Sequence, residues 1–516
     1  MTIVKSMDFD VVVAGAGPVG LMLACELRLA GVSAVVVERL TEVDTTIKAG
    51  SINLPTAEAL YRRGLLPALA ETQREIFARF MRPGAGGPPG KPGPKVLGHF
   101  AGIMLHDDLL DTSDPDLAGH GPAANVSLVP QAELERLLGD RASALGVEVR
   151  RGVELTGFDQ DDEGVTVHTD RGTIRAAWLA GCDGGRSTVR RLAGFDFPGT
   201  SPEITGHQAL VEIEGAEDLG MGWHRTDTGV YVHGPMPGRI LTVQFGGPPA
   251  DRDAPITADE LQAALRRVSG VDVTITAVHT ATRFTDNARQ ATTYRLGRVL
   301  LAGDAAHVHS PFGGQGLNLG IGDAMNLGWK LAAAIRGWAP EGLLDSYTAE
   351  RQPVGAWVLD WTRAQVALMR PEPRARAMRD IVTDLARTVA GTTYFAKKLS
   401  GVWQHYDLEG DHPLVGRTAP DLELADGTRL ADLLHGGQAL LLDLTGGDAE
   451  IGSHAERYGD RLRVVATTCP DRPDLTGLLV RPDGITVWAS GDPDTPETLD
   501  KALTRWLGAP AEFSAA

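Results

Sequence analysis

The chain has 516 residues, of which 43% are hydrophobic and 22% are charged. This length exceeds what one hydrophobic core usually organises, so we expect two or three globular domains. The formal net charge is −18 at pH 7, and no run of lysine and arginine offsets it. Such a charge repels polyanions, which argues against nucleic acid and against an anionic membrane surface as partners.

The cysteines stand singly, with no C-x-x-C pair and no cluster with histidine: Cys25, Cys182 and Cys469. This spacing supports neither a disulfide framework nor a zinc site, and we predict no bound metal. The segment before Val11 is short and polar, so we expect no secretory signal. Together these features predict a protein of the reducing cytoplasm.

The chain begins with a pattern typical of a strand, a glycine turn, a helix and a second strand. Residues 11–14 are apolar, residues 15–20 read Gly-Ala-Gly-Pro-Val-Gly, and residues 21–29 favour a helix. A second apolar run at 34–37 ends at Glu38. The segment is apolar enough to suggest a membrane span, but its charges, glycines and prolines fit a buried β-α-β unit better. This order predicts a site for a nucleotide diphosphate.

Each residue of this pattern has a physical role in binding a dinucleotide. Gly15 permits the sharp turn, Gly17 lets the backbone approach the pyrophosphate, and Gly20 lets helix and strand pack closely. The helix N-terminus offers N–H groups and partial positive charge to the phosphates. Glu38 can accept hydrogen bonds from the adenosine ribose and would repel a 2′-phosphate. NADP is therefore disfavoured at this position, whereas NAD and FAD both remain.

The next stretch predicts a loop, a helix and several strands. A proline- and glycine-rich run at 82–94 is typical of a surface loop. A helix is expected at 130–145, because leucines recur on one face and a proline stands near its start. Alternating residues at 147–150, 165–168 and 174–178 predict strands of a small antiparallel sheet.

A second turn of acid and glycine follows the apolar run at 179–182, where residues 183–187 read Asp-Gly-Gly-Arg-Ser. Ser187 can cap the helix that comes next. Taken alone, this segment is equally an ordinary strand–helix junction. From about residue 195 to 284, several alternating segments predict a second, β-rich domain inserted within the first.

A third and more specific loop follows the apolar strand at 299–302. Asp304 stands at the carboxyl end of that strand, where doubly wound folds bind ligands, and it can accept hydrogen bonds from a polyhydroxyl chain. Residues 311–318 read Pro-Phe-Gly-Gly-Gln-Gly-Leu-Asn and lead into a helix expected at 317–335. The glycines let backbone lie against a flat ring, and the positive end of the helix would stabilise a reduced flavin.

The three motifs resemble those of single-component flavoprotein aromatic hydroxylases of the p-hydroxybenzoate hydroxylase fold, in the same order and at the same spacing. The resemblance covers about residues 8–370. It implies an α/β chain with a Rossmann-like FAD-binding domain and an inserted β-rich substrate domain. In length, the chain is most similar to bacterial hydroxylases of polycyclic aromatic polyketides. Rifampicin monooxygenases and a Baeyer–Villiger oxidase of aureolic-acid biosynthesis are near relatives.

The segment from about residue 411 predicts a separate α/β unit. Strand-like runs at 439–444 and 464–468 precede a hairpin at 478–488 around Pro-Asp-Gly. This order resembles a thioredoxin-like domain, which polyketide hydroxylases also carry. Residues 445–448 read Thr-Gly-Gly-Asp where thioredoxins place C-x-x-C. We therefore expect no dithiol exchange, and instead a role in packing or dimer support.

The resemblance also implies a division of the chain into domains. The expected parts are an FAD-binding domain at 1–80, 115–195 and 285–370, a substrate-binding β-sheet domain at 81–114 and 196–284, a helical linker at 371–404, and the thioredoxin-like domain at 405–516.

Position by position, the resemblance assigns residues to FAD. They come from the glycine fingerprint, the acid-tipped strand, the two later acidic turns and the first turns of two helices: Gly15, Gly17, Pro18, Val19, Gly20, Glu38, Arg39, Gln131, Asp183, Asp304, Gly316, Leu317 and Asn318. For Gln131, an exposed place in the first turn of a helix is the alternative.

The resemblance implies three residues of the catalytic site. Pro311 and Phe312 would lie beside the flavin ring near the substrate. Relatives often have an arginine in the loop after the acid-tipped strand, whereas this chain has Lys48. Lysine keeps the positive charge but lacks the planar fork that binds bidentately. Lys48 is therefore a candidate for catalysis and for FAD binding, and equally an ordinary loop lysine.

Candidate substrate-binding residues are mostly aromatic and lie on the expected middle sheet or beside the flavin loops: Phe100, Trp223, Tyr231, His233 and Pro311. Aromatic residues on a sheet are also ordinary core residues, and that alternative stays open. His307 and His309 have the spacing of metal ligands, but no carboxylate or cysteine completes a site, so we expect them to hydrogen-bond within the loop.

The resemblance implies an FAD- and NAD(P)H-dependent monooxygenase that hydroxylates a polycyclic aromatic polyketide in antibiotic biosynthesis, through a flavin C4a-hydroperoxide. NADPH or NADH would visit as a transient co-substrate with O2, because the chain carries a single nucleotide fingerprint. The alternatives are Baeyer–Villiger oxidation, antibiotic inactivation, flavin-dependent reduction, or a flavoprotein that only sequesters a drug or intermediate. The expected partner is a small polycyclic aromatic molecule, and the expected state is a monomer or homodimer.

Overall fold

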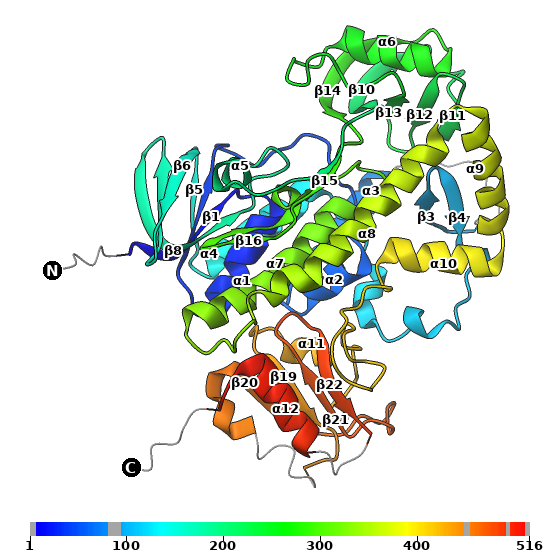
Figure 1. Ribbon diagram of the computed structural model, residues 1–516. Helices are drawn as coiled ribbons and strands as arrows, with labels where there is room; N and C mark the ends of the chain where they lie inside the picture. The colour runs from blue at the N-terminus through cyan, green and yellow to red at the C-terminus, as the bar shows by residue number, and fades with distance from the viewer. Residues whose placement is uncertain (1–6, 81–93, 448–454, 492–495, 511–516) are drawn as a thin grey trace, which may run out of the picture.

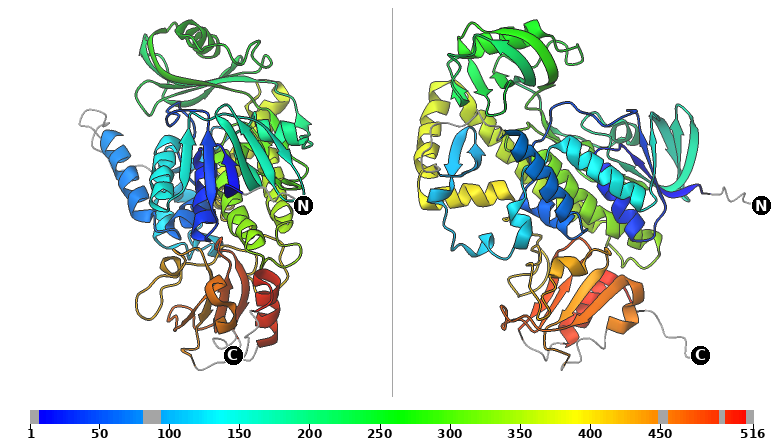
Figure 2. Two further views of the ribbon diagram at one scale, coloured as in Figure 1. Left: turned by 90° about the vertical axis from the view of Figure 1, so that its left-hand side faces the viewer. Right: turned by 180° about the vertical axis from the view of Figure 1, so that it is seen from behind.

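The computed structural model describes residues 7–80, 94–447, 455–491 and 496–510. Residues 82–93 of the expected surface loop lie outside this part of the chain, as does Asp448. A central α/β body carries a second β-sheet above it and a smaller α/β unit below it (Figures 1 and 2). This architecture confirms the predicted fold class of an α/β chain with a β-rich insertion.

The central body is built on an eight-stranded sheet, in which six strands follow the order β16-β17-β8-β1-β2-β5 while β7 pairs with β8 and β6 with β7. Its parallel core is buried on both faces, which explains the unbroken apolar runs of the sequence. The strands are β1 (Phe9–Ala14), β2 (Ala34–Glu38), β5 (Glu148–Arg151), β6 (Leu155–Gln160), β7 (Val165–Thr169), β8 (Gly172–Gly181), β16 (Arg295–Leu296) and β17 (Val299–Leu301).

The expected small antiparallel sheet is not a separate sheet. β5 pairs in parallel with β2 instead of with the strands that follow it. β8 is long enough to serve twice: its first half pairs antiparallel with β7, and its second half pairs in parallel with β1 and β17. Local alternation identified the strands but could not identify their partners, because pairing is a tertiary property.

Helices cover both sides of this sheet (Figure 2). α1 begins at Pro18, whose fixed φ and missing N–H suit the first helical position. It packs against α4 and α7. The helices of the body are α1 (Pro18–Leu29), α2 (Leu54–Tyr61), α3 (Leu66–Phe80), α4 (Gln131–Ala144), α5 (Thr188–Ala193), α7 (Gln315–Ile335) and α8 (Ser346–Met369). The helix expected at 130–145 is therefore confirmed as α4.

The second sheet is antiparallel, with the order β11-β12-β13-β10-β14. One face packs against α6 (Ala258–Ser269), and the other packs toward the β3–β4 hairpin and α8. Two further helices, α9 (Pro373–Ala386) and α10 (Val389–Ser400), flank that hairpin (Figure 1). The strands are β10 (Thr205–Glu214), β11 (Gly222–Arg225), β12 (Gly229–His233), β13 (Arg239–Gln244), β14 (Thr274–Phe284), β3 (Val96–Phe100) and β4 (Ile103–His106).

A short three-stranded sheet, in the order β18-β15-β9, lies where the two larger sheets meet. Its strands are β9 (Gly199–Thr200), β15 (Ala288–Gln290) and β18 (His307–Val308). β18 directly follows the loop that contains Asp304. The loop is therefore held by a strand pair on its carboxyl side as well as by β17 on its amino side.

The C-terminal unit has a four-stranded sheet in the order β20-β19-β21-β22. β19 and β20 are parallel, and the remaining pairs are antiparallel. The predicted hairpin around Pro482-Asp483-Gly484 is the β21–β22 connection. The elements are α11 (Leu430–Leu433), β19 (Ala439–Asp443), β20 (Leu462–Ala466), β21 (Gly477–Val480), β22 (Thr486–Ser490) and α12 (Pro496–Leu507). Its thioredoxin-like character stays a prediction.

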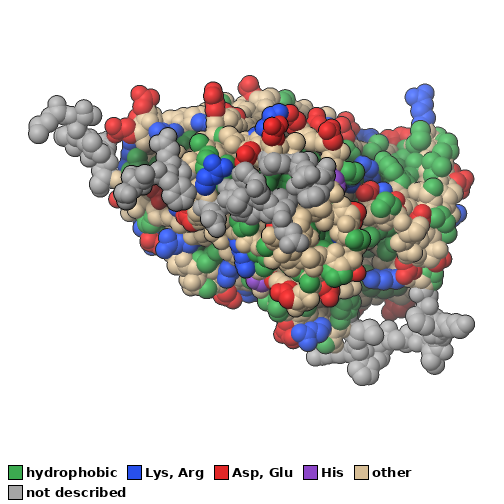
Figure 3. All heavy atoms as spheres, turned by 90° about the horizontal axis from the view of Figure 1, so that it is seen from below, with side chains coloured by type: hydrophobic (Ala, Val, Ile, Leu, Met, Phe, Trp, Pro, Cys, Tyr) green, Lys and Arg blue, Asp and Glu red, His purple; other side chains and the backbone are tan. Residues whose placement is uncertain are grey.

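Two properties follow from the described residues. Among them, none of the helices combines the length and the apolar character that crossing a bilayer requires. On the face drawn in Figure 3, acidic and basic side chains are interspersed and form no field of one sign.

Buried ion pairs join the C-terminal unit to the central body. Arg481 donates to both carboxylate oxygens of Glu350 on α8, at 2.9 and 2.8 Å, and also pairs with Asp483. Lys330 on α7 lies 2.9 Å from the same Glu350 carboxylate. Arg63 pairs with Glu26 at 2.6 Å and donates to the carbonyl oxygen of Leu434 in the C-terminal unit.

We expect Arg481→Met to lower the free energy of unfolding by about 3–5 kcal/mol, because it leaves two carboxylates buried without their main partner. Lys330→Met is the matched control: Glu350 keeps both hydrogen bonds from Arg481, so the loss should be smaller. Urea unfolding followed by circular dichroism measures both. Equal losses in the two variants would contradict this account of the interface.

Candidate active site

The three sequence motifs meet at one edge of the central sheet. The glycine turn follows β1, the turn with Asp183 follows β8, and the loop with Asp304 follows β17. These strands are neighbours and run parallel, with Gly181 in register with both Ala14 and Leu301. Parallel strands deliver the residues after their carboxyl ends to the same edge, which is where doubly wound folds bind ligands.

The first two turns are in contact, and glycine is what permits it. Gly15 has φ +105°, and a β-carbon there would lie 2.4 Å from the carbonyl oxygen of Cys182. A β-carbon on Gly20 would lie 2.0 Å from the carbonyl oxygen of Gly15. Both positions are therefore closed by backbone, as the fingerprint predicts for the turn and for helix–strand packing.

Gly17 differs from its neighbours in the fingerprint. Apart from Gly17 itself and its two chain neighbours, no described protein atom lies within 4 Å of the position its β-carbon would take. Gly17 precedes α1 directly, so this open space lies at the end of a helix whose first N–H groups have no intrahelical acceptor. An open space beside helix N–H groups that have no intrahelical acceptor fits a pyrophosphate.

The third loop packs on the same helix. A β-carbon on Gly303 would lie 3.1 Å from the Val19 side chain, and one on Gly320 would lie 2.5 Å from that side chain. Val19 thus wedges between the loop and α7. Asp304 is exposed at the tip of the loop, where its carboxylate is open to a ligand.

The carboxylates of Glu38 and Asp183 accept hydrogen bonds from backbone N–H groups of the protein itself. Glu38 accepts hydrogen bonds from the N–H groups of Ala16 and Leu40, each at 2.8 Å, and Arg39 beside it is exposed. One oxygen of Asp183 accepts from the first N–H groups of α5, while Oδ1 is buried without a partner. Burial raises the pKa of Asp183, although these hydrogen bonds act against it. An orphaned carboxylate oxygen is consistent with a ligand donor at this place.

The start of α7 presents backbone rather than side chains. Gly313 and Gly314 both have positive φ, and Gly314 caps the helix. The side-chain amide of Asn318, a residue expected to contact the flavin ring, donates to the carbonyl oxygen of Gly314 at 2.7 Å and accepts from the N–H of Asn53 at 2.8 Å. Its side chain therefore fixes the turn, and the N–H groups of Gly316 and Leu317, in the first turn of α7, have no intrahelical acceptor.

Gln131 begins helix α4, and Lys48 lies in the loop that follows β2. The N–H of Gln131, at the start of α4, donates to the carbonyl oxygen of Ala49 at 2.8 Å. Lys48 is paired with Asp44 at 2.6 Å, with its side chain 39% exposed. Burial alone would raise the pKa of Asp44, but hydrogen bonds from Lys48 and Thr46 lower it to about 2. In this state Lys48 serves its own loop.

Aromatic residues of the second sheet pack against Phe312, which belongs to the third loop. Phe312 is buried and makes edge-on contacts with Trp223 and Phe284, at ring distances of 6.4 and 5.8 Å. Phe100 belongs to the same cluster and packs 4.4 Å from the Trp361 ring. The expected residues Phe100, Trp223 and Phe312 are therefore brought together, and Pro311 is exposed beside them.

Tyr231 and His233 depart from the expectation of a substrate wall. Tyr231 is buried on the opposite face of the sheet, in the cluster with Leu261 and Leu265 of α6. Its neighbours Val230 and Val232 belong to the Phe312 cluster. Since side chains alternate along a strand, His233 shares the Tyr231 side. The sequence shows that β12 carries aromatic residues, but it does not show which face of the sheet each side chain occupies.

Sequence reasoning missed Phe284, Trp361 and Gln365. Gln365 accepts from the N–H of Ala101 at 3.1 Å and donates to the carbonyl oxygen of Phe312 at 3.3 Å, so it ties the β3–β4 turn to the flavin loop. Four-residue spacing of Trp357, Trp361 and Gln365 on one helix could have indicated a shared face.

The glycine pair supports a sharp prediction for FAD, the dinucleotide that the resemblance implies. Gly17→Ala should leave the stability of the cofactor-free protein unchanged and weaken FAD binding about tenfold or more, because its methyl group enters ligand space. Gly20→Ala should cost about 3 kcal/mol of stability before any cofactor is added, since its methyl group meets backbone. Thermal unfolding and FAD titration of the cofactor-free proteins measure the two effects. Destabilisation by Gly17→Ala would refute the assignment of that space.

Comparison with known families agrees with this geometry. A family profile described as an FAD binding domain matches residues 8–362, and a profile described as the C-terminal part of aromatic-ring hydroxylases matches residues 412–510. Together they span both the central body and the C-terminal unit.

Relatives and solved structures match over nearly the whole chain. A 12-dehydrotetracycline 5-monooxygenase/anhydrotetracycline 6-monooxygenase of Streptomyces rimosus is 41% identical over 98% of this chain and 100% of its own. A rifampicin monooxygenase of Streptomyces venezuelae is 40% identical over 97% and 99%. The structure of the anhydrotetracycline hydroxylase OxyS from Streptomyces rimosus superposes with a TM-score of 0.85 at 40% identity, covering 98% and 100%. The chain therefore belongs to the FAD-dependent aromatic-ring hydroxylases, a family of flavin monooxygenases.

Proposed function

We propose that this protein hydroxylates a polycyclic aromatic polyketide, with FAD as bound cofactor, NADPH or NADH as transient electron donor and O2 as oxidant. The observation that carries the proposal is that the dinucleotide loops lie next to aromatic residues of the second sheet: Phe312, in the third loop, contacts Trp223 and Phe284. A flat aromatic substrate between them would lie between FAD-binding backbone on one side and aromatic rings on the other.

The residues at the sheet edge fit FAD. We assign the pyrophosphate to the open space at Gly17, the adenosine ribose to Glu38, and the ribityl chain to the exposed carboxylate of Asp304. The first turn of α7 would face the ring with the N–H groups of Gly316 and Leu317. When bound, FAD supplies the transfer of electrons from the nicotinamide donor to O2 and of one oxygen atom to the substrate.

The protein orients the cofactor and substrate, stabilises charge on the reduced ring and excludes water from the site. The N-terminal end of α7 stabilises negative charge on the reduced ring through its free N–H groups and helix dipole. The buried rings of Phe100, Phe312 and Trp361 exclude water from the substrate side. Gln365 hydrogen-bonds to the backbone of Ala101 and of Phe312, which fixes the β3–β4 turn relative to the third loop. We propose Pro311 as a residue that borders both cofactor and substrate.

Inactivation of a polycyclic antibiotic is the second candidate, supported by the similarity to the rifampicin monooxygenase. Baeyer–Villiger oxidation would use the same loops and the same aromatic residues. The outcomes differ in the product, because hydroxylation keeps every ring intact whereas Baeyer–Villiger oxidation gives a lactone or an acid.

The test is to incubate purified protein with NADPH, isotopically labelled O2 and a panel of tricyclic and tetracyclic phenols, followed by mass spectrometry. We expect one labelled oxygen atom in a product whose rings are intact, and substrate-stimulated NADPH oxidation. A lactone or acid product would favour the Baeyer–Villiger alternative. Tight binding without NADPH oxidation would sink the enzymatic proposal and favour a sequestering flavoprotein.

The two faces of β12 and its neighbour supply a matched pair for the substrate wall. Trp223→Leu should raise KM for the aromatic substrate about tenfold, because it removes a ring from the face shared with Phe312. Tyr231→Phe, on the face toward α6, should leave KM unchanged. Steady-state kinetics measures both values. If Tyr231→Phe raised KM more than Trp223→Leu, the substrate would bind on the α6 side of the sheet, and the proposed substrate site would be wrong.

Three further properties belong to the same proposal. We propose the domain division 1–80, 115–195 and 285–370 for FAD, 81–114 and 196–284 for substrate, 371–404 as linker and 405–516 as the C-terminal domain. We also propose a cytoplasmic location, which fits three cysteines that form no disulfide. A monomer or homodimer is the expected state.

A further inference from the structure

A buried carboxylate on α7 is hydrogen-bonded to the loop that presents Asp304. Asp323 has no exposed surface. Its Oδ2 atom accepts from the N–H of Gly303 at 3.0 Å and lies 2.7 Å from Nε2 of His307. Gly303 belongs to the loop that presents Asp304, and His307 begins β18 directly after that loop. The position of that loop therefore depends on where the Asp323 carboxylate stands.

The other oxygen of Asp323 is held by α8. Arg351 donates through Nε to Oδ1 of Asp323 at 2.8 Å and through a second nitrogen to the carbonyl oxygen of Leu319 at 2.9 Å. Arg351 thus fixes both the carboxylate and the backbone of α7 near its N-terminal end. Gly322 makes room for it, because a β-carbon there would lie 2.7 Å from the guanidinium.

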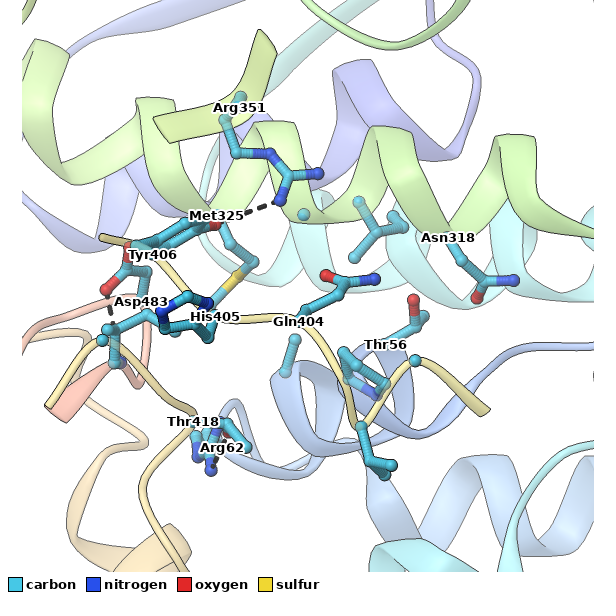
Figure 4. A pocket seen from close by; sticks show the side chains of 18 residues that line it. Thr56, Arg62, Asn318, Met325, Arg351, Gln404, His405, Tyr406, Thr418 and Asp483 are labelled. Carbon is cyan, nitrogen blue, oxygen red and sulfur yellow. Dashed lines mark hydrogen bonds between the residues drawn. The ribbon is translucent and has the colours of Figure 1, made fainter. Parts of the chain in front are cut away.

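Arg351 reaches one more partner, outside the central body. Its remaining terminal nitrogen donates to the hydroxyl oxygen of Tyr406 at 3.0 Å, the contact drawn as a dashed line in Figure 4. Both side chains border a cavity of about 70 Å³ between α2, α7 and the segment that leads into the C-terminal unit. The hydroxyl of Tyr406 is thus the end of a hydrogen-bonded chain of side chains that starts at the loop with Gly303 and Asp304.

Tyr406 is itself held by the C-terminal unit. Its N–H donates to the carbonyl oxygen of Gly416 at 2.8 Å, and the N–H of Gly416 donates to the carbonyl oxygen of Thr486 on β22 at 2.9 Å. The Arg481 guanidinium lies 5.5 Å from the Tyr406 ring. The same Arg481 binds Glu350, the residue next to Arg351. The C-terminal unit therefore grips two consecutive residues of α8.

The charges in this chain are mutually supporting. Burial alone would raise the pKa of Asp323, but His307 and Arg351 outweigh it and hold that pKa below its usual range. The four side chains come from β18, α7, α8 and the segment before Gly416. Hydrogen-bonded groups in a low-dielectric interior fix distances more tightly than apolar contacts, which tolerate small slips. Such a network suits a loop whose backbone must meet a ligand.

We propose that the chain Tyr406–Arg351–Asp323–His307 is a positioning device through which the C-terminal unit sets the place of the Gly303–Asp304 loop and of the first turn of α7. In this role the C-terminal unit changes the affinity for FAD and the reduction potential of the bound flavin without contacting FAD. The inference rests on FAD binding, and it is independent of which substrate is oxidised.

Tyr406→Phe is the decisive variant, because it removes one hydroxyl at the far end of the chain and keeps the ring. We expect the Kd for FAD, measured by flavin fluorescence on the cofactor-free full chain, to rise about three- to tenfold. We also expect the midpoint potential of the bound flavin to shift. Asp323→Asn should have a larger effect on both, since an amide cannot accept from all three donors.

Thr498→Val is the matched control within the C-terminal unit. It removes the hydrogen bond from Nε1 of Trp488 to Thr498, at 3.0 Å, which lies off the chain. We expect it to lower the unfolding temperature and to leave the FAD Kd and the flavin potential unchanged. If Tyr406→Phe behaves like this control, with wild-type Kd and potential, the chain is structural only and the proposal is overturned. None of these readouts needs a substrate, so failure of the proposed hydroxylation would be seen separately.

Discussion

The structure depends on the parallel pairing of β8 with β1 and β17. This pairing brings three turns that are far apart in the sequence to one sheet edge, with Gly181 opposite both Ala14 and Leu301. The turns then approach within backbone contact, which only glycine allows at positions 15 and 20. The third loop packs on the Val19 side chain of the first motif, so all three loops lie close enough for one dinucleotide to contact.

Much of the FAD side could be predicted from the sequence, because its signals are local. A glycine fingerprint, an acid after an apolar strand and a helix start are each written in a few consecutive residues, and the structure places Gly17, Asp183 and Asp304 at one edge. The assignment of strand partners failed where one strand served two neighbours, as β8 does. Local alternation carries no information about which strand lies alongside.

The substrate side was predicted less well, because it depends on which face of a sheet each residue presents. Trp223 and Tyr231 are equally aromatic in the sequence, yet one meets Phe312 and the other meets α6. Phe284 and Trp361 were missed because their contacts are long-range. Asn318 is instructive in another way: it lies in the predicted segment, but both ends of its amide serve the backbone around it. A position in a motif does not say which atoms face the ligand.

Buried ion pairs attach the C-terminal unit to the central body, and they define its position more than they add to its binding free energy. Lys330, Glu350, Arg481 and Asp483 are buried at the junction, and removing charges from water costs much of what their attraction returns. Burial lowers the pKa of Lys330 to about 7, despite the attraction of Glu350. An apolar interface of equal size would often bind at least as firmly. Ion pairs that reach α7 and α8 therefore make sense if the relative position of those helices, and of the loop they support, is what the unit maintains.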